Sequence, residues 1–279
     1  MRYLLLLRPH NWIKNFFIFV PLFFAQAIFT PELLTLATYA FLAFSALASC
    51  IYVINDIVDI ERDRLHPKKK HRPLAAGLIS PALGWLIALA LLLIATALIV
   101  FIVPAILPVM LVYFIANLAY SFYFKQVPIV DILMVAGFYV LRVSAGALAV
   151  DVQISGWLLL ATIFVALFLV IGKRKAELIA SDGKDTRAVL QQYTPEFLNL
   201  LMSMSVVMML VIYSVYTVLV LSSHRGVYSI FFVLLGVFRY LYLSYNGNET
   251  EQPEQIIFSD FWIFISAIGW IAFMYAVLY

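Results

Sequence analysis

Long apolar runs constrain this chain more than any other feature of its sequence. Stretches of about 20 mostly apolar residues recur from one end to the other, and this is the length of α-helix that crosses the hydrocarbon core of a bilayer. Hydrophobic residues fill 65% of the 279 positions, charged residues fill only 12%, and the mean hydropathy is +1.02. Soluble domains carry about 25% charged residues. The chain is therefore predicted to be an all-α membrane protein.

Nine apolar stretches predict nine transmembrane helices in one transmembrane domain over residues 1–279, because no linker or repeat divides the chain. They lie near residues 12–30, 33–54, 82–103, 105–123, 128–150, 155–172, 196–221, 227–245 and 260–279. The connections alternate between nearly uncharged and basic, so that every Lys and Arg except Arg142 and Arg225 falls on one side. The positive-inside rule makes that side cytoplasmic, with the N-terminus inside and the C-terminus outside.

One connection is unlike its surroundings. Residues 55–72, "NDIVDIERDRLHPKKKHR", hold four acidic and six basic side chains. Positive charge alone is typical of a loop that orients a membrane protein, and this remains an alternative for the "HPKKKHR" part. Acidic residues contribute little to orientation, and ionisable groups at the end of an apolar span indicate function. The acids therefore point to a site.

The spacing of these acids favours a metal site. On a helix, Asp56, Asp59 and Asp63 lie within roughly 60° of one another, and Asn55 is one turn before Asp59. Like charges on one face repel unless a cation lies among them, and Mg²⁺ prefers hard oxygen ligands together with substrate phosphates. The three aspartates are the candidate catalytic residues, and with Asn55 they are the candidate metal ligands. The side chains that follow are candidates to hold phosphate oxygens: Arg64, His66, Lys68 and Arg72. For His66 a structural role is equally open.

With these residues in hand, the chain resembles the UbiA superfamily of intramembrane prenyltransferases, whose first motif has the form N-D-x-x-D-x-x-x-D. The segments "RPHNWIKN" near the start and "RPLAAG" after the motif are similar as well. The resemblance spans essentially the whole chain and implies a UbiA-like helical bundle that uses Mg²⁺. One departure is informative. The superfamily's second motif, D-x-x-x-D, is replaced here by "GKRKAEL" at residues 172–178, which favours a bound anion over a second metal.

The decaprenyl-phosphate phosphoribosyltransferase branch of the superfamily resembles this chain at "GKRKAEL" and across residues 120–150. That likeness implies transfer of 5-phosphoribose from phosphoribosyl pyrophosphate (PRPP) to a polyprenyl phosphate, with release of pyrophosphate. It also implies a bacterial plasma membrane enzyme of cell-wall biosynthesis with its active site facing the cytoplasm. The expected partners are the two substrates and the bilayer, and no nucleic acid. A homo-oligomer is left open.

The resemblance adds further candidates for substrate binding. Tyr120 is a candidate to contact the sugar, and Lys125 to contact a phosphate, although Lys125 and Lys14 also suit ordinary positive-inside residues. Lys173 and Arg174 are candidates for the bound anion.

Three more polar residues have two open interpretations each. Arg142 is either a ligand for substrate or part of a buried pair or network, since Asp131 lies on the same helix face. Glu177 either faces the first motif or pairs with Lys173 one turn earlier. Asp260 is predicted mainly as the N-cap of the last helix.

Two other classes of function remain as rivals. A prenyltransferase that joins an isoprenyl diphosphate to an aromatic or other small acceptor shares the fold, the metal and the membrane side. A transporter is disfavoured because the charges cluster at one membrane face rather than at the midplane. A phosphatidyl-alcohol transferase is disfavoured because its D-G-x-x-A-R signature is absent.

Overall fold

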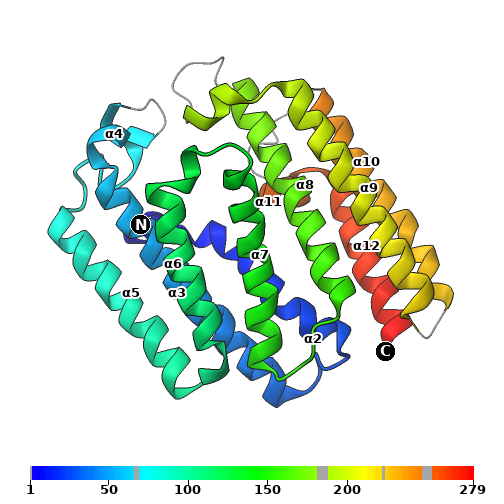
Figure 1. The fold of residues 1–279 in the computed structure, drawn as a ribbon. Coiled ribbons are helices and arrows are strands. Elements are labelled where there is room, and N and C mark those ends of the chain that lie inside the picture. The colour runs from blue at the N-terminus through cyan, green and yellow to red at the C-terminus, as the bar shows by residue number, and fades with distance from the viewer. Residues whose placement is uncertain (1, 66–68, 181–187, 222–223, 247–252) are drawn as a thin grey trace. The chain divides into compact units, whose positions relative to one another are not determined.

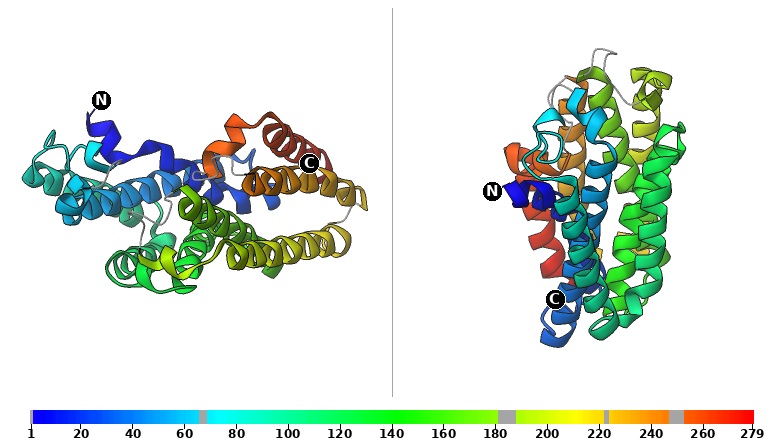
Figure 2. Two further views of the ribbon diagram at one scale, coloured as in Figure 1. Left: turned by 90° about the horizontal axis from the view of Figure 1, so that it is seen from above. Right: turned by 90° about the vertical axis from the view of Figure 1, so that its left-hand side faces the viewer.

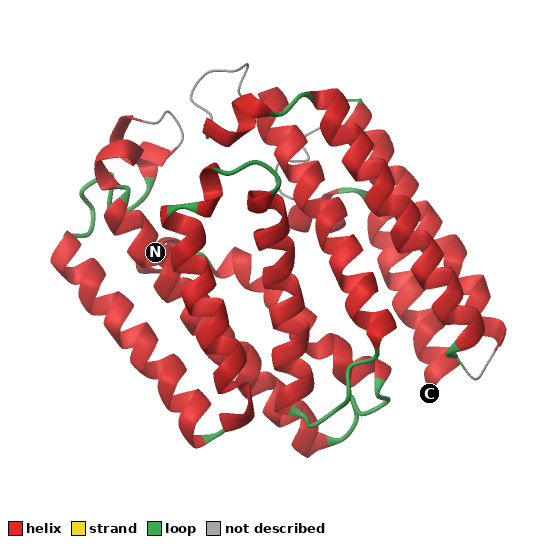
Figure 3. Cartoon of the chain, viewed as in Figure 1, coloured by secondary structure: helices red, strands yellow, loops and turns green. Residues whose placement is uncertain are grey.

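A computed structural model describes residues 2–65, 69–180, 188–221, 224–246 and 253–279, and within these ranges the chain forms helices and no strand (Figure 3). Two compact units are formed. The first comprises residues 1–124 and 141–154, and the second comprises residues 125–140 and 155–279. The sequence-based prediction of a single domain stays a prediction.

The first unit is built around the long helix α3 (Pro31–Val58). Within this unit, α3 packs along α5 (Pro81–Phe101) and contacts α6 (Leu107–Phe122), as the ribbon in Figure 1 shows. The other elements are α1 (Arg2–Leu7), η1 (Pro9–Phe19), α2 (Val20–Phe24), α4 (Ile60–Leu65), η2 (Lys69–His71), η3 (Pro104–Ile106) and residues 141–149 of α7 (Val130–Ala149). Ser80 begins α5 as its N-cap, because its hydroxyl accepts from the N–H of Leu83 at 3.3 Å.

The N-terminal segment runs beside α3 (Figure 2), and the predicted span over residues 12–30 is not confirmed. The residues from Pro9 to Phe19 form a 3₁₀ helix and those from Val20 to Phe24 a short α-helix. Polar side chains within "RPHNWIKN" bond sideways to α3. Those bonds fix the segment to its neighbour, and its helical run changes from 3₁₀ to α at Val20.

A tight turn brings the "RPLAAG" segment back to the end of α3. Gly77 has φ +70°, a left-handed conformation that glycine adopts without a steric penalty. The N–H groups of Leu78 and Ile79 both donate to the carbonyl of Pro73. Leu74 and Ile79 are buried in a cluster with Cys50 and other apolar side chains of α1, α3, α4 and α5. Burying a leucine contributes roughly 2 kcal/mol, so this cluster holds the turn and the neighbouring Arg72 in place.

The second unit is an array of long helices. Helix α8 (Gly156–Ala180) packs along α9 (Pro195–Leu219), and α10 (Ile230–Tyr245) packs along α12 (Phe261–Leu278). The shorter elements are η4 (Phe124–Gln126), η5 (Ala188–Gln192), η6 (His224–Ser229) and α11 (Pro253–Ser259), with residues 130–140 of α7. Thr194 is the N-cap of α9, since its hydroxyl accepts from the N–H of Phe197.

Eight helices within the described ranges are long and apolar enough to cross a membrane. They are Pro31–Val58, Pro81–Phe101, Pro104–Phe122, Val130–Ala149, Gly156–Ala180, Pro195–Leu219, Arg225–Tyr245 and Phe261–Leu278. They correspond to the last eight of the nine predicted spans, so the all-α membrane class is confirmed and the count of nine is not. The sixth predicted span ended at residue 172, whereas α8 continues to Ala180. The "GKRKAEL" motif therefore lies on a helix and not in a connection.

Candidate active site

The acidic motif lies where α3 passes into α4. Asp56 is in the last turn of α3, Asp59 is the residue at which α3 ends, and Asp63 is in α4. Helical hydrogen bonds continue through the junction, from the Asp59 N–H to Asn55 and from the Asp63 N–H to Asp59. Asp56 and Asp63 are each 2% exposed, whereas Asn55 and Asp59 are half-buried.

Two arginines from outside the motif neutralise these buried carboxylates. Arg72 Nη1 lies 3.0 Å from Asp56 Oδ1 and 2.6 Å from Asp63 Oδ2. Arg8 Nη2 donates to the same Asp56 oxygen at 2.5 Å, and its guanidinium lies 5.3 Å from the ring centre of Tyr52. A buried carboxylate is stable only when charge partners or hydrogen bonds compensate for its lost hydration. The site thus balances two acids with two guanidinium groups.

The donor set of the motif fits a hard divalent cation. Oxygens of Asp56 and Asp63 both contact one positively charged nitrogen, Arg72 Nη1, so the two carboxylates are close enough to share a cation. Mg²⁺ is commonly held by one or two carboxylates, with water and substrate phosphates completing its shell. Among the described residues, no group of three or more His, Cys, Asp or Glu side chains is arranged to enclose a metal by itself. A metal here therefore needs oxygens from water or substrate.

The remaining candidates of the charged stretch have other positions. Arg64 is exposed, pairs with Glu61 at 2.8 Å and donates to the carbonyl of Ala75 at 3.3 Å, so it ties α4 to the "RPLAAG" turn. His66 and Lys68 lie outside the described residues.

Three other predicted substrate contacts, Lys14, Tyr120 and Lys125, are half-buried. Lys14 donates to Asn11 within η1. Tyr120 lies near the end of α6, and Lys125 lies in η4.

The basic motif on α8 supports the second unit through two of its three bases. Arg174 is 2% exposed and donates from Nε to Asp131 Oδ2 at 2.8 Å and from Nη1 to Glu177 Oε2 at 2.9 Å. Lys175 is 4% exposed and donates to the carbonyl of Ser244 near the end of α10. A cation at a helix C-terminus is stabilised by the helix dipole. Lys173, in contrast, is half-buried.

Asp131 is the centre of a buried network. Its Oδ1 accepts from the hydroxyl of Tyr193 at 2.7 Å, and that hydroxyl accepts from the N–H of Ile129 at 2.6 Å. Burial raises the pKa of the Tyr193 hydroxyl, and its hydrogen bond to Asp131 raises this pKa further. Tyr193 therefore stays protonated and acts as a donor throughout the physiological range.

Arg142 takes part in a buried network, which was one of its two open interpretations. Its Nε donates to Asn15 Oδ1 at 2.8 Å and its Nη2 to the hydroxyl of Tyr113 at 3.2 Å, within the first unit. Its guanidinium also lies 5.2 Å from the ring centre of Phe44. The predicted alternative of a buried network is thus confirmed for Arg142, while Asp131, about 16 Å away along the helix axis, bonds to Arg174.

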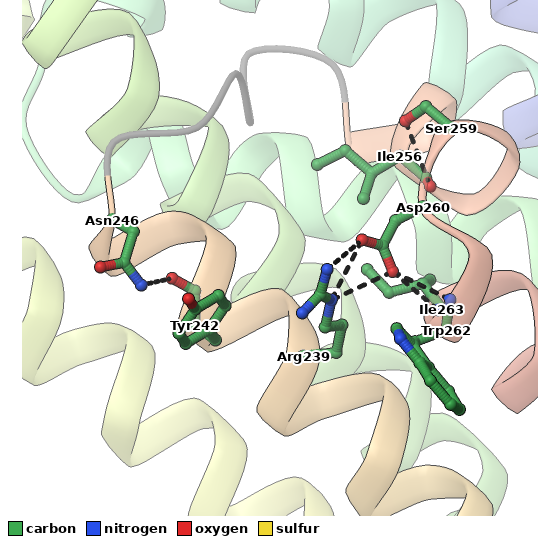
Figure 4. Close-up of polar contacts among 8 residues, drawn as sticks. All are labelled: Arg239, Tyr242, Asn246, Ile256, Ser259, Asp260, Trp262 and Ile263. Carbon is green, nitrogen blue, oxygen red and sulfur yellow. Dashed lines mark hydrogen bonds and ion pairs between the residues drawn. The ribbon is translucent and has the colours of Figure 1, made fainter.

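The start of α12 is fixed by an ion pair, shown in Figure 4. Asp260 accepts from the N–H groups of Trp262 and Ile263, which confirms its predicted role as N-cap. Arg239 of α10 donates to both oxygens of the same carboxylate, from Nε to Oδ1 and from Nη2 to Oδ2. The hydrogen bonds from Arg239 hold the pKa of Asp260 below its ordinary value, and the capped N–H groups lower it further.

Comparison with known proteins identifies the fold and the family. Residues 15–268 match the UbiA prenyltransferase family. The chain belongs to this family. A solved UbiA homologue from Archaeoglobus fulgidus, bound to GPP and Mg²⁺, superimposes with a TM-score of 0.74 at 22% identity over 100% of this chain and 99% of the other. A UbiA homologue from Aeropyrum pernix K1 gives a TM-score of 0.70 at 16% identity over 97% of each chain.

Curated relatives narrow the likeness within the UbiA family. The decaprenyl-phosphate phosphoribosyltransferase of Mycobacterium tuberculosis is 32% identical over 278 residues, which cover 95% of this chain and 90% of the relative. The protein of the same name from Corynebacterium glutamicum is 32% identical over 277 residues, which cover 95% and 83%. The resemblance drawn from the motifs is confirmed, and the protein is a transferase of the UbiA family.

Sequence reasoning about this UbiA family member missed three residues that the structure connects to its predicted site. Arg8 was known only as part of "RPHNWIKN", Asp131 only as a neighbour of Arg142 on one helix face, and Tyr193 not at all. An aspartate or arginine in or beside an apolar span needs a partner, which is a usable signal for the first two. Tyr193 carries no comparable signal in a chain with 16 tyrosines.

Proposed function

We propose that this protein transfers 5-phosphoribose from PRPP to a polyprenyl phosphate, with release of pyrophosphate and with dependence on Mg²⁺. The observation that carries the proposal is the 32% identity to proteins named decaprenyl-phosphate phosphoribosyltransferase along 95% of this chain. The residues agree with a substrate of this kind. PRPP bears a pyrophosphate that suits the aspartate motif and a separate 5-phosphate that suits basic side chains.

The altered second motif supports phosphoribosyl transfer over prenyl transfer. Within residues 173–177 the single acid is Glu177, and it pairs with Arg174 at 2.9 Å. The D-x-x-x-D form would supply two carboxylates here, and this segment supplies one, so a second metal site lacks half of its acidic ligands. Lys173, which is half-buried on the same turn of α8, is the base of this motif that we assign to a substrate phosphate.

The proposed roles in the first motif follow from charge. Asp56, Asp59 and Asp63, with Asn55, would hold Mg²⁺, which when bound stabilises the negative charge that develops on the departing pyrophosphate. Arg72 contacts Asp56 and Asp63, and we assign it to oxygens of that pyrophosphate. His66 and Lys68 remain proposals for further phosphate contacts.

The bond changes are simple. The bond from ribose C1 to the pyrophosphate oxygen breaks, its electron pair leaves with pyrophosphate, and C1 gains oxocarbenium character as in glycoside cleavage. An oxygen of the lipid phosphate then forms the new bond to C1. That oxygen is already anionic near neutral pH, so a strong general base is not required.

The proposal includes an orientation in the membrane. The active site faces the cytoplasm of a bacterial plasma membrane, with the N-terminus inside and the C-terminus outside. This orientation rests on the distribution of Lys and Arg, because all of them except Arg142 and Arg225 are predicted to lie at one membrane face.

A second candidate is prenyl transfer from an isoprenyl diphosphate to an aromatic or other small acceptor. The solved UbiA homologues bound to Mg²⁺ with DMAPP or GPP favour it, because they have the same fold. The first motif serves either reaction. Phosphoribosyl transfer and prenyl transfer are therefore distinguished by which substrates the purified protein turns over.

The test uses purified protein in detergent with Mg²⁺, a polyprenyl phosphate and PRPP radiolabelled in the ribose. We expect label in a lipid-extractable product, with the rate lowered about a hundredfold or more in Asp56→Asn and Asp59→Asn. Glu61→Gln is the matched control, since Glu61 lies between these aspartates and Asp63 but its side chain is 84% exposed. It should stay within about twofold of wild type. Absence of label with several lipid lengths, together with turnover of a polyprenyl diphosphate and an aromatic acid, contradicts the proposal.

A further inference from the structure

A ladder of polar bonds fixes the N-terminal segment to α3. Asn15 Nδ2 donates to Ser45 Oγ at 2.9 Å, and Trp12 Nε1 donates to Ser49 Oγ at 3.0 Å. Ser49 in turn donates to the carbonyl of Leu7 at 2.8 Å. The bonded positions of α3 lie on successive turns that lead toward the aspartate motif. The N-terminal segment is therefore held at a fixed register along α3, and the next contact of this ladder reaches Asp56.

Arg8 makes that contact from an unusual backbone. It has φ 51° and ψ 56°, a left-handed conformation that costs a non-glycine residue about 1 kcal/mol, and it precedes Pro9. Its carbonyl accepts from the N–H of Asn11 at 2.9 Å, which closes the turn into η1. The conformation begins the 3₁₀ helix and fixes the direction in which the chain, and with it Arg8, meets α3.

Asp56 cannot keep all these partners and also bind a metal through the same oxygen. Its Oδ1 accepts from both Arg8 and Arg72, at 2.5 and 3.0 Å, and its side chain is 3% exposed. A carboxylate oxygen has two lone-pair sites, and two guanidinium donors fill them. A cation that binds this oxygen must displace a donor. Arg72 is held at the motif by a second carboxylate, Asp63 at 2.6 Å, whereas the one carboxylate that Arg8 contacts among the described residues is that of Asp56, so Arg8 is the donor that a cation displaces.

We propose that Arg8 is a positioning residue of the first motif. Its guanidinium stays bonded to Asp56 until a divalent cation binds that carboxylate and displaces Arg8. This inference rests on the proposed function, in which Asp56 binds a metal. Once displaced, Arg8 is still held at the motif by the N-terminal ladder, where its charge is available to the diphosphate. Arg8 therefore weakens binding of the metal alone and strengthens binding of the metal together with a diphosphate. Metal binding becomes coupled to substrate.

The test measures binding of Mn²⁺ by electron paramagnetic resonance to detergent-purified protein, first without substrate and then with inorganic pyrophosphate. In Arg8→Gln we expect Mn²⁺ alone to bind on the order of tenfold more tightly, the effect of one charge about 5 Å from a divalent ion in water-like surroundings. We also expect pyrophosphate to increase the affinity for Mn²⁺ less than it does in wild type. Arg62→Gln is the matched control, because it removes the same charge from an exposed position on α4.

The outcomes separate this inference from the proposed function. Equal Mn²⁺ affinity in Arg8→Gln and Arg62→Gln overturns the role of Arg8 and leaves phosphoribosyl transfer untouched. Absence of Mn²⁺ binding in both wild type and Arg8→Gln overturns it together with the metal role of the first motif.

A second measurement covers the case in which Arg8→Gln does not fold. Wild-type protein is treated with phenylglyoxal, and modification of Arg8 is followed by mass spectrometry as Mn²⁺ is added. Displacement from Asp56 predicts faster modification of Arg8 with metal, while Arg62 is modified at a constant rate. A rate for Arg8 that does not change at saturating Mn²⁺ overturns the inference.

Discussion

Replacing Asp131 by asparagine tests the claim that the basic motif of α8 supports the second unit. Asp131 has no exposed surface and accepts from Arg174 and Tyr193, at 2.8 and 2.7 Å. Asparagine keeps the shape and one acceptor oxygen but removes the charge. Of the two carboxylates that Arg174 contacts here, only Glu177 then remains. The Arg174 side chain is 3% exposed, whereas the Glu177 side chain is 22% exposed.

The size of the effect follows from this burial. Breaking a buried ion pair by removing one partner costs about 3–5 kcal/mol, and the retained acceptor places Asp131→Asn near 3 kcal/mol. For a chain of this length, that loss lowers Tm by roughly 6 °C. The assay is thermal loss of helical circular dichroism in a fixed detergent.

Two comparisons make the measurement specific. Adding Arg174→Gln removes the uncompensated charge, so the double variant should recover at least about half of the lost stability. Tyr228→Phe removes a hydroxyl from a tyrosine that is 62% exposed and should change the free energy of unfolding by less than about 0.5 kcal/mol. The ion-pair reasoning is refuted if Asp131→Asn and Tyr228→Phe have the same Tm. It is also refuted if Arg174→Gln lowers the Tm of Asp131→Asn further.

Two further predictions concern packing and pH. A Cβ added at Gly146 would lie 1.9 Å from the carbonyl oxygen of Ile18, so Gly146→Ala should cost about 3 kcal/mol or more by forcing η1 away from α7. A Cβ added at Gly137 on the same helix would have no atom within 4 Å, so Gly137→Ala should be neutral or stabilising. The two variants are compared by the rate at which the single buried thiol, Cys50, is labelled during thermal unfolding. Because the pKa of Asp260 is depressed by Arg239, its stabilisation is complete above the ordinary carboxyl pKa of about 4 and is lost as the pH falls through the lower pKa of the folded state. The difference in Tm between wild type and Asp260→Asn should therefore be the same at pH 7 and 5 and shrink at pH 3, and a difference that grows in acid contradicts this assignment.

Features that depend on local chemistry could be predicted from the sequence. Of the nine spans predicted from apolar length, eight meet helices within the described residues that are long and apolar enough to cross a membrane, because about 20 apolar residues match the thickness of a bilayer. The role of Asp260 as N-cap needs only its own carboxylate and the N–H groups two and three residues later. The aspartate motif and its family were likewise visible, since the spacing of Asp56, Asp59 and Asp63 is a property of one continuous segment.

What the tertiary structure decided is which charges meet. Arg142 bonds to Asn15, Arg174 to Asp131 and Arg8 to Asp56, across separations of 127, 43 and 48 residues. The sequence requires that each charge buried in or beside an apolar span find a partner, but many arrangements of the helices would satisfy that requirement. The packing of η1 against α3, and the bond from Arg174 of α8 to Asp131 of α7 within the second unit, belong to one of them. The polar side chains of the first predicted span bond to α3, a contact that its apolar length alone does not predict.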